Sequence, residues 1–401
     1  MKVFVVNCGS SSIKYRLFDM ADESVLAGGL LERVGQPNAL LHHVAGQKSR
    51  DRGVQAPDHG AGLKLVIAAL TDAEVGVIRR VEEIHGVGHR VVHGGEQIRQ
   101  SKLIDPAVIE VIRQNCELAP LHNPPNLAGI EAARSALPAT PQVAVFDTAF
   151  LSTLPPHAFR YAVPEDWYRR YHVRRYGFHG TSHRYVSLRA AELLGKDPRQ
   201  VNLITCHLGN GCSMTAVAAG KAVDHSMGLT PLEGLVMGTR SGDLDPAVIF
   251  HMARRAGLSL EQLDEALNTR SGLLGVSQVS NDMRDVLSAA AGGRESAALA
   301  VELFVYRLAK YVGAYYAILP GVDAVVLTGG IGENAVPVRR ELCRRLERLG
   351  AVGDPQRNET TVGGQAGAIT TQDSPLPVWV VPTDEELMIA RDTRALVQAG
   401  E

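Results

Sequence analysis

The sequence predicts an α/β protein of two domains. Its 401 residues exceed the length at which a single hydrophobic core stops growing. Short apolar segments typical of buried strands alternate with segments of helical periodicity, which is the pattern of α/β folds. No long low-complexity segment separates the two halves. We therefore expect the domains to pack against each other with a cleft between them.

Charge and cysteine content limit the functional classes. The formal net charge is −2, so no basic excess indicates a nucleic-acid or membrane surface. The chain has five cysteines, an odd number, and none of them form a C-x-x-C pair. This favours reduced thiols over a disulfide framework. The apolar run Val3–Val6 is too short for a signal peptide, and no run is long enough to span a membrane. We expect a cytoplasmic protein.

The first half begins with an expected antiparallel meander of three strands, Val3–Asn7, Ile13–Asp19 and Ser24–Glu32. The polar segment 35–60 fits hairpins or loops. Further along we expect a helix at Gly62–Leu70, a strand within 86–95, helices at Pro106–Leu118 and 122–137, and a buried strand at Val143–Phe146.

A second α/β series starts near residue 150. Its expected strands are Val201–His207, Cys212–Ala218, Ala324–Thr328 and Val378–Val381. Its expected helices are Ser182–Leu194, Asp245–Arg255, Ser259–Leu267, Ser296–Leu319, Pro337–Leu349 and Glu385–Val397.

Two strand–turn–strand segments resemble each other, one in each half. They are VVNCGSSSIKYRLFD at 5–19 and LITCHLGNGCSMTAV at 203–217. Each places Asn, Gly and Ser between apolar strands, and glycine lets backbone N–H groups approach a phosphate closely. Glycine-rich hairpin turns are also common, so the pattern alone leaves phosphate binding and a plain turn equally open.

Two further loops carry functional signals. MGTRSGDLDP at 237–246 places Arg240 between glycines, where a permanently charged planar guanidinium suits an oxyanion. LTGGIGENA at 327–335 follows a buried strand and precedes a helix, the position where α/β folds bind nucleotides. By contrast, His85, His89 and His93 lie on an expected strand, where their side chains would not converge on a metal.

The chain resembles the acetokinase family, within the superfamily of acetate and sugar kinases, Hsp70 and actin. The resemblance covers essentially the whole sequence and rests on blocks in the family order: NCGSSSIKY, GHRVVHGG, LAPLHNPPN, VFDTAF, YGFHGTSH, CHLGNGCS, TPLEGLVMGTRSGDLDP, NDMRD, GGIGEN and TDEELMIARDT. It implies a two-domain, ribonuclease H-like fold with a duplicated βββαβαβα core and an interdomain cleft. The implied domains are 1–150, with helix 385–401 packing back on it, and 151–384, which binds nucleotide and dimerises.

The resemblance also implies the site residues. The transferred phosphoryl group is surrounded by Asn7, Arg90, Asp147, His179 and Arg240, and Mg²⁺ (Mn²⁺ as an alternative) is held by Asn7, Asp147 and Glu385. The acyl methyl pocket comprises Val92, Leu121, Phe178 and Pro231, beside Arg90. The nucleotide and its phosphates are bound by Ser10, Ser12 and Lys14 of the first hairpin turn, and by His122, His207, Leu208, Gly209, Asn210, Gly211, Asp282, Met283, Arg284, Gly330, Ile331, Gly332 and Asn334.

The implied reaction is a reversible in-line transfer between ATP and acetate that yields ADP and acetyl phosphate, a step of acetyl-CoA biosynthesis. A carboxylic acid with a pKa of about 4.3 is already an anion at neutral pH, so no general base is needed. The resemblance further implies a homodimer. Alternatives are a propionate or other short-chain acyl kinase, a sugar kinase, and an Hsp70- or actin-like ATPase scaffold.

Overall fold

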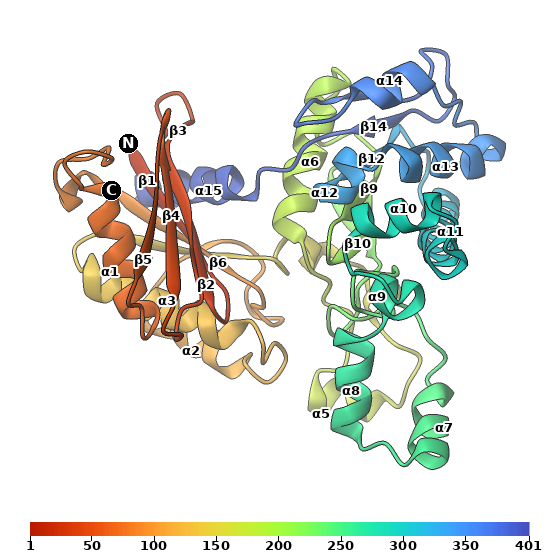
Figure 1. Ribbon diagram of the computed structural model, residues 1–401, viewed down its shortest axis with the longest axis horizontal. Helices are drawn as coiled ribbons and strands as arrows, with labels where there is room; N and C mark the ends of the chain where they lie inside the picture. Colours follow the sequence, from red (N-terminus) through yellow and green to blue (C-terminus); the bar gives the residue numbers. More distant parts are fainter. Residues whose placement is uncertain (401) are drawn as a thin grey trace. The chain divides into compact units, whose positions relative to one another are not determined.

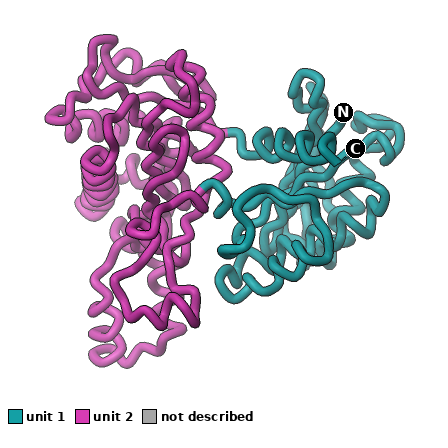
Figure 2. The backbone as a smooth tube through the Cα atoms, turned by 180° about the vertical axis from the view of Figure 1, so that it is seen from behind, with its two compact units in different colours: residues 1–150, 384–401 teal, residues 151–383 magenta. Residues whose placement is uncertain are grey.

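The computed structural model describes residues 1–400, which divide into two compact units (Figure 2). Unit 1 comprises residues 1–150 together with the segment from Asp384 onward, and unit 2 comprises Leu151–Thr383. The chain therefore leaves unit 1 after Phe150 and returns to it after Thr383.

Unit 1 is built on a mixed sheet of eight strands in the order β5-β4-β3-β2-β1-β6-β8-β7 (Figure 1). The strands are β1 (Lys2–Cys8), β2 (Ser12–Asp19), β3 (Ser24–Glu32), β4 (Ala39–Ala45), β5 (Lys48–Val54), β6 (Gly86–Val91), β7 (Lys102–Leu103) and β8 (Gln142–Phe146). Strands β1 to β5 form an antiparallel meander, whereas β1, β6 and β8 are parallel. The helices of unit 1 are α1 (His59–Leu70), η1 (Val81–Glu83), α2 (Pro106–Gln114), α3 (Asn123–Ala136), α15 (Glu385–Gly400) and the start of η2 (Phe150–Thr153).

Alternating residues of β1 serve two separate hydrophobic cores. Phe4 and Val6 belong to a core that includes Leu63 and Val66 of α1. Val3 and Val5 face the opposite way and belong to a core with residues of α15, among them Ile389. Because successive side chains of a strand point to opposite faces, the sheet is covered on one face by α1 and on the other by α15.

Helix α15 packs against β6 at Gly88. A Cβ atom at this position would lie 2.4 Å from Thr393 Oγ1 and 2.6 Å from Ile389 Cγ2, which is closer than side chains tolerate. The absence of a side chain at Gly88 therefore sets the distance between helix and sheet.

We predict that Gly88→Ala lowers the free energy of unfolding by about 1–3 kcal/mol, the usual cost of overpacking a filled core. Gly53→Ala in β5 is the matched control, because nothing lies within 4 Å of its Cβ position. Urea unfolding of both variants measures the difference. Equal stability of the two would show that α15 shifts freely and that the close approach is not a constraint.

Unit 2 is built on a six-stranded sheet in the order β11-β10-β9-β12-β14-β13. Its strands are β9 (Leu203–Leu208), β10 (Cys212–Ala218), β11 (Lys221–His225), β12 (Ala324–Thr328), β13 (Gly367–Ala368) and β14 (Val378–Val380). Its helices are α4 (Pro156–Phe159), α5 (Glu165–Tyr171), α6 (Gly180–Leu193), α7 (Ala247–Ala256), α8 (Leu260–Thr269), α9 (Gly272–Ser277), α10 (Met283–Ala291), α11 (Glu295–Ile318), α12 (Gly329–Asn334), α13 (Val336–Leu346), η3 (Glu347–Leu349) and α14 (Pro355–Thr360).

The two sheets repeat one topology. In unit 1 the order β3-β2-β1-β6-β8 combines an antiparallel meander with parallel neighbours, and β11-β10-β9-β12-β14 does the same in unit 2. The similar segments 5–19 and 203–217 form the equivalent hairpins β1–β2 and β9–β10. The predicted α/β fold with a duplicated core is confirmed.

Several local expectations were wrong or incomplete. Ser12 and Lys14 do not belong to the first turn but to β2, because Ser12 already pairs with Glu32 of β3 and leaves only residues 9–11 to the turn. Residues 329–334 form the short helix α12 instead of an open loop. Strand β11 and helices α5, α9, α10 and α14 were not expected from the sequence.

All five cysteines are free thiols. Within residues 1–400, no helix is both long enough and apolar enough to cross a membrane.

Candidate active site

In unit 1, three predicted residues lie where parallel strands end. Asn7 is the penultimate residue of β1, Arg90 the penultimate residue of β6, and Asp147 directly follows β8. Because β1, β6 and β8 are parallel neighbours, their carboxyl ends meet at one edge of the sheet. Ligands of open α/β sheets bind at this edge.

Arg90 and Asp147 form a two-pronged ion pair. Arg90 Nη2 donates to Asp147 Oδ2 at 2.6 Å, and Arg90 Nε donates to the same oxygen at 3.1 Å. The Asp147 side chain is 1% exposed and that of Arg90 is 24% exposed. Burial alone lowers the pKa of Arg90, but the charges of Asp147 and Glu385 raise it above its ordinary value. Arg90 is therefore a fixed cation beside a buried carboxylate.

Glu385, the first residue of α15, approaches the same guanidinium, with Oε2 3.9 Å from Arg90 Nε. Burial raises the pKa of Glu385 to about 7, against the opposing charge of Arg90 and together with the charges of Asp147 and Glu386. Two carboxylates thus share one cation. Carboxylate and amide oxygens suit Mg²⁺, which takes one or two carboxylates along with phosphate and water, so Asp147, Glu385 and Asn7 could hold it.

A second ion-pair group orients the start of α15. Lys14 pairs with Glu386, and Arg16 Nη1 donates to Asp384 Oδ1 at 3.1 Å. Lys14 and Arg16 lie two residues apart on β2 and therefore share a face. The structure consequently places Lys14 as a partner of Glu386. Ser10, by contrast, is exposed in the turn.

Two buried asparagines of α3 join the strand ends, a role that was missed from the sequence. Asn126 Oδ1 accepts from the Val92 N–H at 3.1 Å, and its Nδ2 donates to Cys8 O at 2.8 Å. Asn123 Oδ1 accepts from the His93 N–H at 3.0 Å. Pairing of β1 with β6 stops at Val6 and His89, and beyond that point the Asn126 amide links Cys8 to Val92, whereas the Asn123 amide bonds to the backbone of His93 and Ile112. In the sequence, the only indication of these two asparagines was the block HNPPN at 122–126.

The residues assigned to the acyl pocket differ in environment. In unit 1, Val92 is 6% exposed, whereas Leu121 is 72% exposed and is not packed within this unit. In unit 2, Phe178 is 2% exposed and Pro231 is partly exposed. His122 is the residue before α3 and is half-buried.

In unit 2, histidines gather behind the β9–β10 hairpin. His179 precedes α6 with a left-handed φ of 57°, and its ring stacks on His207 at 4.3 Å between centroids. His207 Nδ1 lies 2.8 Å from Ser182 Oγ, which lies 2.8 Å from Thr383 Oγ1. The strained turn is held by His225, whose Nε2 accepts from the Phe178 N–H at 3.1 Å. Both predicted histidines are thereby fixed in orientation.

Arg240 lies beside this group. A Cβ atom on Gly211 would be 3.3 Å from His179 Cε1 and 3.4 Å from Arg240 Nη1, so both side chains flank the glycine turn Gly209–Gly211. Arg240 Nη1 donates to Pro231 O at 3.3 Å, and burial lowers the pKa of Arg240. Among the described residues, Arg240 has no carboxylate partner. A half-buried guanidinium without an anion is suited to binding an anionic ligand.

The residues assigned to adenosine lie in two places of unit 2. Asn210 Oδ1 accepts from Asn281 Nδ2 at 3.1 Å, next to Asp282, which caps α10 and pairs with Arg284. Met283 is buried.

In α12, Glu333 Oε1 accepts from the Gly329 N–H at 2.9 Å, and no atom lies within 4 Å of a Cβ on Gly330. Both stretches begin at helix N-termini. Leu208 ends β9 in the core, and Gly209, Gly211, Ile331, Gly332 and Asn334 complete the predicted set on the β9–β10 turn and α12.

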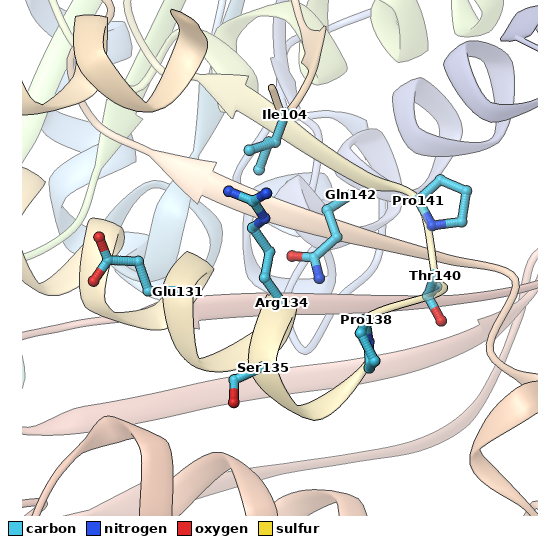
Figure 3. A pocket seen from close by; sticks show the side chains of 8 residues that line it. All are labelled: Ile104, Glu131, Arg134, Ser135, Pro138, Thr140, Pro141 and Gln142. Carbon is cyan, nitrogen blue, oxygen red and sulfur yellow. The ribbon is translucent and has the colours of Figure 1, made fainter. Parts of the chain in front are cut away.

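A separate hollow of about 520 Å³ lies in unit 1 (Figure 3). Gln142, which begins β8, lines it together with Arg134 of α3, Thr140 and Pro141. Asp147 follows the opposite end of the same strand, so this hollow is not part of the candidate site. Gln142 Oε1 instead lies 2.9 Å from His89 Nε2.

Comparisons with known proteins show what the whole chain is similar to. The sequence pattern of the Acetokinase family matches residues 2–391. The chain is 53% identical over 399 residues to an acetate kinase of Thermotoga maritima, which covers 99% of each chain. The crystal structure of Porphyromonas gingivalis acetate kinase superposes with a TM-score of 0.95 at 47% identity over 99% of both chains. A propionate kinase of Francisella tularensis gives a TM-score of 0.92 at 40% identity, covering 98% of this chain and 99% of that one.

Proposed function

The chain belongs to the acetokinase family and is a kinase, and from this premise we propose that it transfers the terminal phosphoryl group of ATP to acetate. The products are ADP and acetyl phosphate, and the transfer is reversible. The observation that carries the proposal is Arg240, a guanidinium without a carboxylate partner beside His179 and a glycine turn. Such a group stabilises the charge of a transferring phosphoryl group.

The proposed acceptor requires no catalytic base. Acetate is an anion at neutral pH, so no proton has to be removed before attack. Asp147 is already engaged by two donors of Arg90 and lies at a strand end with Glu385. We therefore assign Asp147 to organising charge, and Arg90 to positioning the acceptor carboxylate and the phosphoryl group.

We assign Mg²⁺, or Mn²⁺ in its place, to Asp147, Glu385 and Asn7. The fit rests on the convergence of two carboxylates on one guanidinium. When bound, the ion would neutralise phosphate charge and orient ATP. Arg90 then serves as the fixed counter-charge that prevents the two carboxylates from repelling each other.

A hydroxamate assay tests the proposed function. Purified protein is incubated with ATP, Mg²⁺, hydroxylamine and one acid of a panel from formate to butyrate. We expect acetyl hydroxamate to form with acetate and depend on Mg²⁺. ADP release without any hydroxamate would favour an ATPase scaffold, and phosphorylation of hexoses but not acids would favour a sugar kinase.

The second candidate function is a kinase that accepts several short-chain carboxylic acids, because a propionate kinase is among the similar structures. Val92 directly follows β6, which ends at Val91, so strand alternation does not by itself place its side chain beside Arg90; we propose that the two side chains face the same pocket. If Arg90 holds the carboxylate, Val92 meets the carbon beyond it and leaves room for little more than a methyl group.

We predict a preference for acetate over propionate and butyrate, within the roughly 10–200-fold that one methylene allows. Val92→Ala should shift kcat/KM toward propionate by about tenfold, since a methylene in a dry pocket gains about 0.8 kcal/mol, or roughly fourfold, and the steric clash with the valine side chain is removed as well. Val91→Ala, on the adjacent and oppositely facing residue, is the control. An unchanged acetate-to-propionate ratio in Val92→Ala would remove Val92 from the pocket.

We further propose a homodimer located in the cytoplasm. Helices α7 and α11 expose large apolar side chains in unit 2: Val248, Phe250, Met252, Leu299, Leu303 and Tyr306. Exposed apolar groups of this kind favour association with a second copy. The free cysteines fit a reducing compartment. Sedimentation velocity tests the assembly, and a purely monomeric boundary at micromolar concentration would contradict it.

A further inference from the structure

The loop that carries Arg240 is closed at its base by two hydrogen bonds. We define this Arg240 loop as residues 234–243. The Asp243 N–H donates to Gly234 O, and the Gly234 N–H donates to Asp243 Oδ1, each at 2.9 Å. A Cβ atom on Gly242, whose φ is 69°, would lie 2.5 Å from Gly234 O. The two ends of the loop therefore lie directly against each other.

Helix α11 contacts both ends of the loop through two side chains on one of its faces, Arg307 and Tyr311. Arg307 Nη1 donates to Gly234 O at 3.1 Å and to Asp243 O at 3.3 Å. The same nitrogen lies 3.3 Å from Asp243 Oδ2. The Tyr311 hydroxyl donates to this carboxylate, at 3.1 Å from Oδ1 and 3.0 Å from Oδ2. We call Asp243, Arg307 and Tyr311 the base clamp.

The chemistry of the base clamp suits a local support. Burial, followed by the charge of Asp243, raises the pKa of Tyr311 above its ordinary value, so the hydroxyl remains a donor. The side chains of Arg307 and Asp243 are 23% and 41% exposed. An ion pair exposed to this degree contributes little to overall stability. Its loss should therefore affect the position of the loop and leave the fold intact.

The guanidinium of Arg240 depends on the loop for its position. Arg240 Nη1 donates to Pro231 O at 3.3 Å and lies 3.8 Å from Met237 Sδ. Both partners belong to the loop or to the segment just before it, so they shift together with it. Among residues 1–400, no carboxylate pairs with Arg240 and holds it from outside the loop. A shift of the loop backbone therefore carries the guanidinium along.

The tip of the loop is held in a different way, by bonds between main-chain groups. The Gly238 N–H donates to Asn210 O at 2.9 Å, and Met237 O accepts from the Leu273 N–H at 2.8 Å. These bonds limit how far the tip can move, so loss of the base clamp should displace Arg240 only slightly. A slight displacement is sufficient, because a misplacement of about 1 Å can cost up to about 10²-fold in rate.

We propose that Asp243, Arg307 and Tyr311 are positioning residues that fix the Arg240 loop and thereby aim the guanidinium of Arg240 at the transferring phosphoryl group. This inference rests on the proposed function. Developing negative charge is stabilised by donors that are already in place before the reaction, so the position of Arg240 affects kcat more than substrate binding. The base clamp acts through Arg240 and is assigned no contact with a substrate.

The variant Arg307→Met with Tyr311→Phe removes both α11 donors of the base clamp. We expect kcat to fall by about tenfold, part of the loss that a misplaced group can cause, while KM for ATP and acetate changes little. Tyr311→Phe alone keeps the ring, whose centroid lies 5.8 Å from that of Tyr315, so it should fold and show part of the loss. Unchanged kcat in both variants would overturn the proposal.

A double-mutant cycle with Arg240→Ala separates positioning from a general loss of stability. Once the guanidinium is absent, the base clamp has nothing left to position. In the Arg240→Ala background, Arg307→Met with Tyr311→Phe should therefore lower kcat by less than about twofold, so that the effects are clearly non-additive. An equal loss of kcat in both backgrounds would overturn the proposal, because the two residues would then act independently of Arg240.

Tyr316→Phe is the matched control. It also removes a tyrosine hydroxyl from α11, but Tyr316 is 41% exposed and, within residues 1–400, makes no hydrogen bond to the Arg240 loop. This variant should retain the kcat of the wild type. A loss equal to that of Tyr311→Phe would show that any change on this helix lowers activity, which would overturn a specific role for the base clamp.

Hydrogen exchange tests the base clamp without any substrate, by NMR or by mass spectrometry of the peptide that spans residues 234–243. In Arg307→Met with Tyr311→Phe, the Asp243 N–H should exchange about fivefold faster, the effect of losing one hydrogen bond of ordinary strength. In Tyr316→Phe it should exchange at the wild-type rate. Unchanged exchange in the first variant would overturn the inference even if acetyl hydroxamate forms, whereas absence of hydroxamate from the wild type would overturn the proposed function alone.

Discussion

Arg240→Ala is expected to lower kcat by about 10²–10³ while the protein remains folded. The loss is that of one preorganised donor to developing negative charge. The fold should survive because, among residues 1–400, the Arg240 side chain pairs with no carboxylate and its guanidinium donates to Pro231 O and Met237 Sδ. Steady-state kinetics at saturating ATP and acetate, with thermal unfolding as a check, measure both effects.

Two further variants sharpen this test. Arg254→Ala removes an exposed arginine from α7 of the same unit and should leave kcat unchanged. Arg240→Lys keeps the charge but loses the planar pair of donors, so it should recover only part of the activity. Retention of more than a tenth of the wild-type kcat in Arg240→Ala would exclude a catalytic role for this residue.

Asp147→Asn is expected to have a comparably large effect, through the metal ion. Asparagine keeps the shape of the side chain but removes the negative charge that pairs with Arg90 and that the proposed Mg²⁺ site requires. Changes in the surroundings of a metal typically cost 10–100-fold in affinity, and loss of a ligand should cost at least as much. We expect the Mg²⁺ concentration for half-maximal activity to rise by at least about tenfold, with kcat only partly restored at excess Mg²⁺.

Glu386→Gln is the control for Asp147→Asn. Glu386 adjoins the proposed ligand Glu385 on α15, but its carboxylate pairs with Lys14. Its loss should leave the Mg²⁺ dependence close to that of the wild type. A normal Mg²⁺ dependence in Asp147→Asn would show that Asp147 does not organise the metal.

The sequence predicted best the features that depend on local pattern. Strands β1, β6 and β8 are short apolar runs, and their ends locate Asn7, Arg90 and Asp147 because parallel strands share one edge. Helix α12 was missed because its glycines have low helix propensity, and packing of the turn on Leu208 overrides that preference.

Contacts between distant residues could not be predicted in this way. Nothing in the local pattern of α3 shows that Asn126 joins the backbone of β1 to that of β6. The hydrogen bonds that link Ser213 of β10 to His179 and to His183 of α6 likewise depend on how α6 lies against β10. Such hydrogen bonds follow from tertiary packing, which sequence periodicity does not specify.

The return of the chain to unit 1 as α15 has a consequence for biosynthesis. The face of the sheet that carries Val3, Val5 and Val143 is covered by α15, which lies at residues 385–400. A ribosome that adds about 5–20 residues per second needs roughly 10–50 s to make residues 151–383. Throughout that time the nascent sheet keeps an apolar face uncovered and lacks Glu385, so covering of that face and completion of the carboxylate pair both await the synthesis of α15.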